Sequence, residues 1–368
     1  WTLVGTPEDT VEGSLCEDGT LEPHKRGFTL MPLLRVGAEL VTRENAEVSQ
    51  ELLQSYLPIP SVDWKYKDLA MRVTALAVGG DQSSMLARYT LTNGGASPID
   101  GSLYLVIHPI QVYPPWQEGH NGFSPIKSLA YSDGTVTLDN DRRILFSKSP
   151  DAFAAKGGTF RVGGPVEGNI ADDVARGELP SGARAEDEDG FASGAARFAF
   201  QLAPGSSTSL VVTVPLHPDS PIPADSFDSL LAQNIAYWSE AVNRVEIDIP
   251  DRALLDTIKA NVAYNLITKD GPGFQPGSRS YDKAWMRDGS SAAIAMLEMG
   301  FRDEVKEFIE WFAEYQFDNG EIPPIIDNKH KDPLWEEKQG LHEFDSNGEF
   351  VHLVNQYYSY TKDVVFLV

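Results

Sequence analysis

The chain has 368 residues, a size at which two domains are more common than a single hydrophobic core. Its hydrophobic fraction of 42% and charged fraction of 23% are those of a globular protein, and no apolar run approaches the roughly 20 residues that span a bilayer. The net charge of −24 argues against nucleic acid as a partner, because phosphates need clusters of Lys and Arg. It suits a neutral or cationic ligand, and equally it serves solubility alone.

The single cysteine, Cys16, excludes an internal disulfide and offers no thiolate metal site. The chain begins at Trp1 and ends at Val368 without a helix stop signal, so we expect it to be a piece of a longer polypeptide. The lack of a signal-like segment then says nothing about secretion.

The first half of the chain has the alternation typical of β-strands, from about residue 63 to residue 216. Residues 103–107 form a nearly continuous apolar run, which is typical of a central strand buried on both faces. No helical period of useful length interrupts the strands, so we predict antiparallel strands stacked as a sandwich. The other expected strands are 72–78, 85–91, 135–138, 197–202 and 209–214.

Residues 163–194 are rich in Gly, Ala, Asp and Glu and are expected to form a surface excursion, with a solvated acidic run at 186–189. The pattern changes near Pro221. Asp225 or Ser226 could cap a helix that runs to about Asn243 and carries apolar residues at helical spacing.

Helical periodicity continues to the end of the chain, and the residues between the third and fourth helices are expected to be a loop, too polar and Pro-rich for the core. The expected helices are 252–268, 286–299, 303–317 and one from about 347, and the loop is 318–346. We therefore divide the chain into a β-domain, a linking helix with its connection, and two helical hairpins. Their bounds are 1–220, 221–250 and 251–368.

The segment Tyr281 to Gly289 reads Tyr-Asp-Lys-Ala-Trp-Met-Arg-Asp-Gly and lies at a predicted helix start. An indole such as that of Trp285 can cover the face of a pyranose ring, while Arg287 and Asp288 bind its hydroxyls. Tyr281 would add a second aromatic ring. The competing interpretation is an ordinary helix start with acidic caps and one core tryptophan.

A second group of carboxylates, Glu343, Asp345 and Glu349, falls at the start of the fourth predicted helix. Acidic residues favour that end of a helix, so capping is one interpretation. Glu343 and Asp345 are two residues apart in a loop, however, and at most one of them can be the cap.

Two loops carry further aromatic residues. Trp335, beside Glu336 and Glu337, could line a sugar subsite or lie in a solvated loop. The segment 109–116 with Trp116 could reach a neighbouring cleft or only pack between domains. The histidines lack the spacing of a metal site, so we predict neither metal nor cofactor.

In this order the motifs resemble those of the six-hairpin glycosidases, in which a β-supersandwich precedes an (α/α)6 barrel, as in glucoamylase-like and glycogen-debranching-like inverting enzymes. The residues that carry the resemblance are Trp285 to Gly289, 318–324, 343–349 and 357–363. The resemblance implies a multi-domain β + α chain, with an antiparallel β-supersandwich followed by the first helices of the barrel. It fixes no individual family.

The resemblance also implies the chemistry. Twelve helices make such a barrel and four are predicted here, so the rest of the barrel would come from beyond Val368. A general acid and a general base work in such enzymes, about 6.5–9.5 Å apart for inversion. The base usually comes from late in the barrel. Asp345, and next Glu343, are the candidates for the acid, and Tyr281, Trp285, Arg287, Asp288, Trp335 and Glu349 are the candidates for sugar binding.

The expected function is hydrolysis of an oligo- or polysaccharide, with an α-glucoside-like substrate, by an inverting mechanism. A phosphorylase of the same architecture and a non-catalytic carbohydrate-binding module are the alternatives. The expected partners are carbohydrate and the remainder of the barrel, without nucleic acid or membrane. An extracellular or periplasmic location is favoured over a cytoplasmic one.

Overall fold

The computed structural model describes residues 1–111, 122–160, 166–167, 169–279, 281–327, 332–334 and 343–367. The chain divides into two compact units, formed by residues 1–6 with 11–235 and by residues 7–10 with 236–368. The division falls within helix α3 (Phe227–Ala241), in the segment that we predicted to link the domains. None of the helices in the described ranges has the length and apolar character required to cross a membrane.

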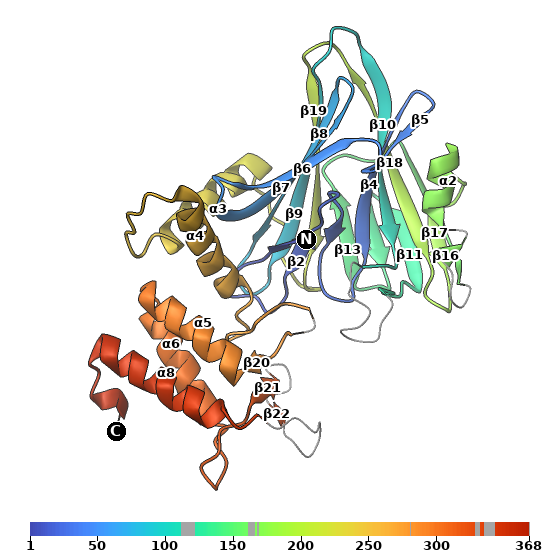
Figure 1. The fold of residues 1–368 in the computed structure, drawn as a ribbon. Helices are drawn as coiled ribbons and strands as arrows, with labels where there is room; N and C mark the ends of the chain where they lie inside the picture. The colour runs from blue at the N-terminus through green and yellow to red at the C-terminus, as the bar shows by residue number, and fades with distance from the viewer. Residues whose placement is uncertain are drawn as a thin grey trace. The chain divides into compact units, whose positions relative to one another are not determined.

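The first unit is a sandwich of two antiparallel sheets (Figure 1). In spatial order the eight-stranded sheet contains β1 (Thr2–Val4), β2 (Gly13–Leu15), β3 (Leu21–Glu22), β4 (Thr29–Val36), β10 (Ile99–His108), β18 (Ser193–Leu202) and β14 (Ala152–Lys156), with β5 (Glu39–Val41) paired to β4. The nine-stranded sheet contains β17 (Arg184–Glu186), β11 (Ser128–Ser132), β12 (Thr135–Leu138), β13 (Arg142–Phe146), β19 (Ser207–Pro215), β9 (Ser84–Asn93), β8 (Leu69–Val78), β7 (Leu57–Tyr66) and β6 (Glu47–Leu53). A separate pair is formed by β15 (Thr159–Phe160) and β16 (Val166–Glu167).

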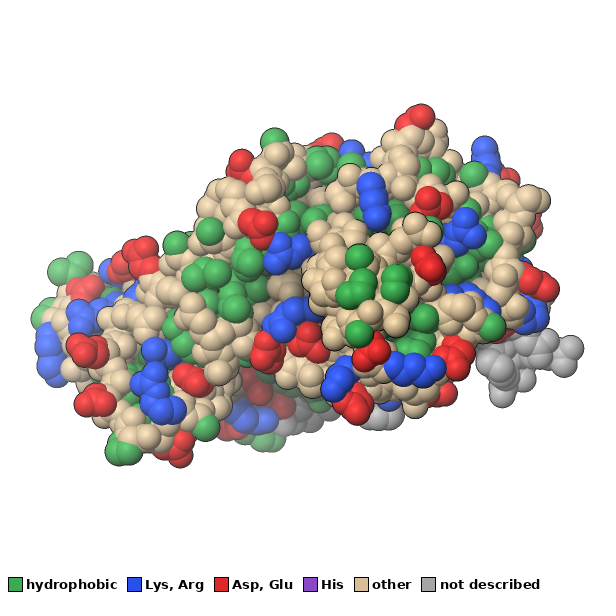
Figure 2. Space-filling model, turned by 90° about the horizontal axis from the view of Figure 1, so that it is seen from above, with side chains coloured by type: hydrophobic (Ala, Val, Ile, Leu, Met, Phe, Trp, Pro, Cys, Tyr) green, Lys and Arg blue, Asp and Glu red, His purple; other side chains and the backbone are tan. Residues whose placement is uncertain are grey.

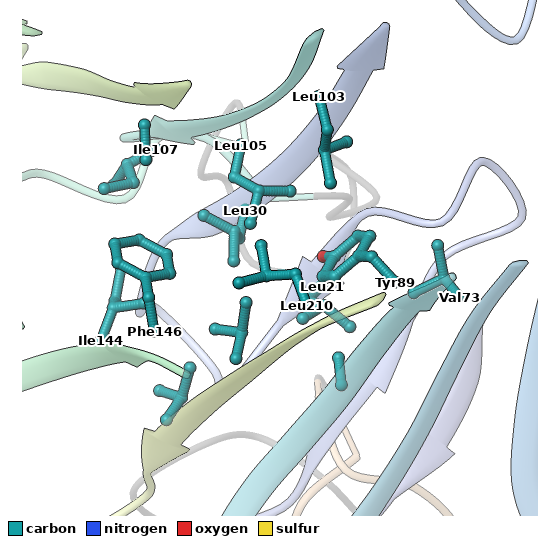
Figure 3. Packing of buried hydrophobic residues seen from close by; sticks show 14 of the residues in the cluster. Leu21, Leu30, Val73, Tyr89, Leu103, Leu105, Ile107, Ile144, Phe146 and Leu210 are labelled. Atoms are coloured by element: carbon teal, nitrogen blue, oxygen red, sulfur yellow. The ribbon is translucent and has the colours of Figure 1, made fainter. Parts of the chain in front are cut away.

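Strand β10 is central and buried on both faces, as its apolar run predicts. It pairs with β4 on one side and β18 on the other. Because side chains alternate along a strand, Leu103, Leu105 and Ile107 point into the sandwich core, where Figure 3 shows them opposite side chains of the second sheet. Tyr104 and Val106 point to the outer face of the sheet. Each fully buried aliphatic side chain of this kind contributes about 1.5–3 kcal/mol to folding.

The outer face of β10 is covered by helix α2 (Ile170–Arg176), which corrects the prediction of a mere surface excursion at 163–194. Ile170 and Val174 are fully buried and pack with residues such as Leu33, Tyr104 and Ala195. Arg35, from β4, donates hydrogen bonds to the carbonyl oxygens of Val174 and Ala175 at the end of the helix. With only two turns, α2 is too short for its period to stand out among the surrounding Gly, Ala, Asp and Glu.

The predicted acidic run at 186–189 is a structured turn. Glu186, Glu188 and Asp189 are exposed, as expected of a solvated face. Asp187 instead accepts hydrogen bonds from the backbone N–H groups of Gly158, Asp189 and Phe191. The prediction that β structure begins at residue 63 is also too late, since β1 to β6 precede it. Strands β1, β2, β3 and β5 have only two or three residues and β6 is polar along most of its length, whereas β4, with eight largely apolar residues, was missed.

On the face of the molecule shown in Figure 2, acidic and basic side chains are interspersed rather than gathered into one patch. The excess of negative charge is therefore distributed on this face, as expected where it serves solubility.

The second unit consists mainly of helices, close to the predicted bounds: α4 (Arg252–Ile267), α5 (Met286–Glu298), α6 (Arg302–Ala313), α8 (Ser346–Thr361) and a 3-10 turn, η1 (Val365–Leu367). Helix α5 packs against α6 and α8, and α6 packs against α8. Their core is aromatic and includes Phe274, Phe308 and Phe312, all fully buried.

The segment between α6 and α8 is not the simple polar loop that we predicted. A small antiparallel sheet joins β20 (Ala284–Trp285), β21 (Ile325–Asp327) and β22 (Asp332–Leu334). Ile325 and Ile326 are buried, with exposed fractions of 1% and 0%. The polar and proline residues on either side hide this short apolar stretch in the sequence.

Candidate functional site

The site is built around the point where the chain passes from strand β20 into helix α5. Trp285 pairs with Ile325 in the sheet, and the next backbone N–H, that of Met286, donates a 2.9 Å hydrogen bond to the carbonyl oxygen of Pro324. Ala284 and Met286 are fully buried on either side. This anchoring leaves Trp285 partly exposed and brings Arg287 and Asp288 to the first turn of α5, where both side chains are exposed.

Tyr281 and Trp285 form an aromatic pair beside this helix start. Their ring centroids are 6.0 Å apart and the rings are inclined by 54°. Tyr281 is 51% exposed, so the pair is open to a ligand. The indole Nε1 of Trp285 is buried and has no acceptor in the part of the chain that the structure describes. A buried N–H without a partner is uncommon in native proteins.

Arg287 joins the start of α5 to the start of α8. Its Nε donates to Oδ2 of Asp345 at 2.7 Å and its Nη2 donates to Oδ1 of Asp345 at 3.0 Å. Nη2 also lies 3.1 Å from Oε2 of Glu343, so one guanidinium faces two carboxylates. The side chains of Arg287 and Asp345 are 49% and 44% exposed, whereas that of Glu343 is 16% exposed. The cluster is therefore accessible to a ligand, while its side chains are held in place by their ion pairs.

This pairing fixes the charge of its members. The hydrogen bonds from Arg287 hold the pKa of the Asp345 carboxyl below its ordinary value, so Asp345 remains ionised at acidic pH. The same contact, together with the charge of Glu343, raises the pKa of the Arg287 guanidinium. Asp345 thus has the properties of a hydrogen-bond acceptor rather than those of a proton donor.

The capping interpretation of Asp345 is wrong. Asp345 occupies the N-cap position of α8, but its side chain makes no capping hydrogen bond. Its carboxylate is engaged with Arg287 instead. The hydroxyl of Ser346 donates to the carbonyl oxygen of Glu343 at 3.1 Å, which fixes the backbone just before the helix.

Asp288 and Glu349 complete the group of carboxylates. Asp288 is in the first turn of α5 and lies close enough to Arg287 to contribute to the rise in its pKa. Glu349, in the first turn of α8, accepts a 3.1 Å hydrogen bond from the hydroxyl of Ser290. Three carboxylates, those of Glu343, Asp345 and Asp288, thus act on one guanidinium, and Glu349 is bound to the same helix α5 through Ser290. All four lie at or near helix N-termini, where the helix dipole favours negative charge.

Ser290 was not recognised from the sequence, and Gly289 was named only as the last residue of the motif, without its structural role. A Cβ at Gly289 would come within 2.7 Å of Cζ of Phe308 and 3.3 Å of the carbonyl oxygen of Phe274, so only glycine lets α5 approach its neighbours. Ser290 lies three residues after Arg287, a spacing that places both on one face of α5. That spacing was the available signal.

The predicted sugar-binding residue Trp335, the histidines His330 and His342, and the segment 112–121 with Trp116 lie outside the described residues. Within the described ranges no three His, Cys, Asp or Glu side chains are arranged to hold a metal ion. Cys16 is buried, and burial together with the charge of Glu22 raises the pKa of its thiol, which makes it a poor nucleophile.

Comparison with known proteins gives a likeness of fold. No protein-family model matches the chain, and no curated protein matches it by sequence. A bacterial glucoamylase solved with acarbose superposes with a TM-score of 0.69 at 12% identity, over 97% of this chain and 55% of the glucoamylase. A structure described as a kojibiose phosphorylase from the human microbiome gives a TM-score of 0.49 at 9% identity, over 92% of this chain and 48% of that protein.

The chain therefore has a glucoamylase-like fold, an antiparallel β-sandwich followed by helices, and the predicted fold class is confirmed. It spans about half the length of the glucoamylase that it matches. At 12% identity the likeness is one of fold and does not identify a family.

Proposed function

We propose that the chain is part of a carbohydrate-active enzyme that hydrolyses glycosidic bonds, with an α-glucoside-like substrate. The observation that carries the proposal is the position of Arg287, paired with Asp345 and Glu343 next to the open Tyr281–Trp285 pair. An aromatic face beside fixed polar groups suits a sugar ring, which has apolar faces and a rim of hydroxyls. The glucoamylase-like fold supports the same class of function.

In this proposal Trp285 and Tyr281 cover one face of the sugar. Arg287 and Asp288 bind its hydroxyls, Arg287 as a donor and Asp288 as an acceptor. Trp335 is proposed to line an adjoining subsite. Carbohydrate and the remaining helices of the barrel are the proposed partners.

The two candidates for the catalytic acid, Asp345 and Glu343, are not equally suited to that role. A general acid must carry a proton at the working pH, and the lowered pKa of Asp345 opposes this. We assign Asp345 to a sugar hydroxyl and to holding Arg287, and we keep Glu343 as the carboxyl available to the reaction. Inversion then needs a second carboxylate on the opposite face of the sugar, about 6.5–9.5 Å away, to activate water. We expect it in the remainder of the barrel.

The test compares binding and turnover in the full-length protein. Acarbose and maltotriose should bind, as measured by titration calorimetry, and maltotriose should be cleaved to a product of inverted anomeric configuration, as followed by NMR. Asp288→Ala should lower turnover by about 100-fold or more, since it removes a direct contact with the sugar. Its melting temperature should stay within about 2 °C of the unmodified protein, because Asp288 is exposed.

Three results would contradict the proposal. A loss of stability in Asp288→Ala with activity retained would identify a cap rather than a binding residue. A strict requirement for inorganic phosphate would identify a phosphorylase. Binding of oligosaccharides without release of sugar from a broad panel would identify a non-catalytic module.

A further inference from the structure

The hydroxyl of Ser290 is fully buried between helices α5 and α8, with an exposed fraction of 0%. Its Oγ lies 3.0 Å from the carbonyl oxygen of Arg287 and 3.1 Å from Oε2 of Glu349. A hydroxyl has one proton, so its bond to the carboxylate competes with its bond to the backbone of its own helix. The charged acceptor forms the stronger hydrogen bond.

The contact is one of two side-chain contacts that join helices α5 and α8. On α5, Arg287 and Ser290 are three residues apart, and on α8, Asp345 and Glu349 are four apart, so each pair shares one helix face. Arg287 meets Asp345, and Ser290 meets Glu349. The backbone N–H of Glu349 donates to the carbonyl oxygen of Asp345 at 2.9 Å, which ties the two carboxylates to one turn of helix.

Only one carboxylate oxygen of Glu349 is occupied by this contact. Within the described residues no hydrogen bond reaches the other oxygen, Oε1, and the side chain as a whole is partly exposed. A glutamate side chain otherwise rotates about three bonds, and ordering it on binding would reduce affinity. Ser290 lowers this entropic cost of binding, because its buried hydroxyl already restricts the Glu349 side chain in the free protein.

We propose that Ser290 is a positioning residue, which orients Glu349 so that its free oxygen accepts a hydroxyl of the sugar held beside Trp285 and Arg287. The inference rests on the proposed function and extends the sugar-binding site to a residue that does not itself touch the ligand. The competing role for Ser290 is to fasten α5 to α8, and it predicts a change in stability without a change in affinity.

The chain supplies a matched control in the next residue. The hydroxyl of Ser291 also lies within hydrogen-bond distance of the carbonyl oxygen of Arg287, at 3.2 Å, but it is exposed and makes no contact with Glu349. Ser290→Ala and Ser291→Ala therefore both remove a hydroxyl that reaches this carbonyl oxygen, and only Ser290→Ala removes a hydroxyl that can donate to the carboxylate of Glu349.

The experiment measures the Kd for maltotriose and the melting temperature in the full-length protein with Ser290→Ala, Ser291→Ala, Glu349→Gln and the double variant Ser290→Ala/Glu349→Gln. Ser290→Ala should raise Kd about tenfold, the size expected for a hydrogen bond to a charged group, whereas Ser291→Ala should change it less than twofold. The double variant should bind as Glu349→Gln does, because the serine acts only through the glutamate.

Other results would contradict either the positioning role of Ser290 or the proposed function. Equal Kd values for Ser290→Ala and Ser291→Ala, or additive effects in the double variant, would overturn the positioning role while leaving the proposed function intact. If Ser290→Ala fails to fold, Glu349→Gln decides, because Glu349 is partly exposed: a Kd equal to that of the unmodified protein overturns the inference. No binding by the unmodified protein would overturn both proposals.

Discussion

The guanidinium of Arg287 meets the carboxylate of Asp345 along one edge, with Nε 2.7 Å from Oδ2 and Nη2 3.0 Å from Oδ1. Two parallel hydrogen bonds of this kind fix both the separation and the relative orientation of the two groups. Because they join residues 58 positions apart, they also align the first turns of α5 and α8. Three tests follow from this site and from the packing around it, and a fourth concerns Cys16 in the first unit.

Arg287→Lys should weaken oligosaccharide binding by about tenfold or more, although the charge is kept. An ammonium group cannot donate along the two edges of Asp345 and still face Glu343 in one plane. Titration calorimetry with maltotriose measures the change. Arg302→Lys, at the exposed start of α6, is the matched control and should bind normally. Equal affinity of Arg287→Lys and the unmodified protein would show that the geometry of the guanidinium is irrelevant.

The Arg287–Asp345 pair should stabilise the folded protein at neutral pH and lose this effect as the pH falls. The pKa of Asp345 is lowered in the folded protein, and an aspartate in the unfolded chain titrates at about pH 3.9. The contribution is therefore complete above about pH 5 and is lost as the pH falls through the folded-state pKa.

Urea unfolding between pH 3 and pH 7 tests this dependence. The difference in unfolding free energy between the unmodified protein and Asp345→Asn should be constant from pH 5 to pH 7 and shrink below pH 4. It should also diminish in 1 M salt, because both side chains are nearly half exposed. Asp225→Asn, at an exposed position, should show no such trend. A difference that grows toward acid would contradict the assignment.

Gly289→Ala should destabilise the protein by about 1–3 kcal/mol, although alanine is the better helix former. The added Cβ would lie 2.7 Å from Cζ of Phe308, inside the aromatic core. Gly348→Ala in α8 is the opposite case, since nothing lies within 4 Å of its Cβ, and it should stabilise by up to about 1 kcal/mol. Denaturant unfolding compares the two. Similar changes in unfolding free energy at both positions would mean that helix propensity, and not packing, determines the effect of the substitution.

Cys16 should be unreactive in the native protein at pH 8. Its side chain is 2% exposed, and burial raises the pKa of the thiol, so little of the reactive thiolate forms. Ellman's reagent should modify it slowly in buffer and completely within minutes in 8 M urea. Rapid modification of the folded protein would show that the first unit opens locally at β2.

The helices could be predicted from the sequence because each has several turns of apolar periodicity. The start of α4, for example, coincides with the predicted residue, Arg252, and α5 with Met286. Helix α2 and the strand β21 could not, because two turns or three residues give too little pattern to stand out. Ile170 and Ile325 are fully or almost fully buried, yet Ile170 directly follows Asn169 and Ile325 directly follows Pro323 and Pro324.

The site was predictable as two local motifs and not as one cluster. Residues 281–289 and 343–349 each have a composition suited to a ligand, but nothing local links Arg287 to Asp345. Their contact arises from the packing of α5 against α8. For the same reason, the capping interpretation was reasonable for Asp345 alone and fails once its partner is known.

The pairing of Trp285 with Ile325 has a practical consequence for engineering the protein. Because successive side chains of a strand point to opposite faces, inserting or deleting one residue between Ala284 and Arg287 would turn the indole away and shift the first turn of α5 by about 100°. Libraries aimed at new ligand preferences should therefore exchange side chains here and leave the chain length unchanged.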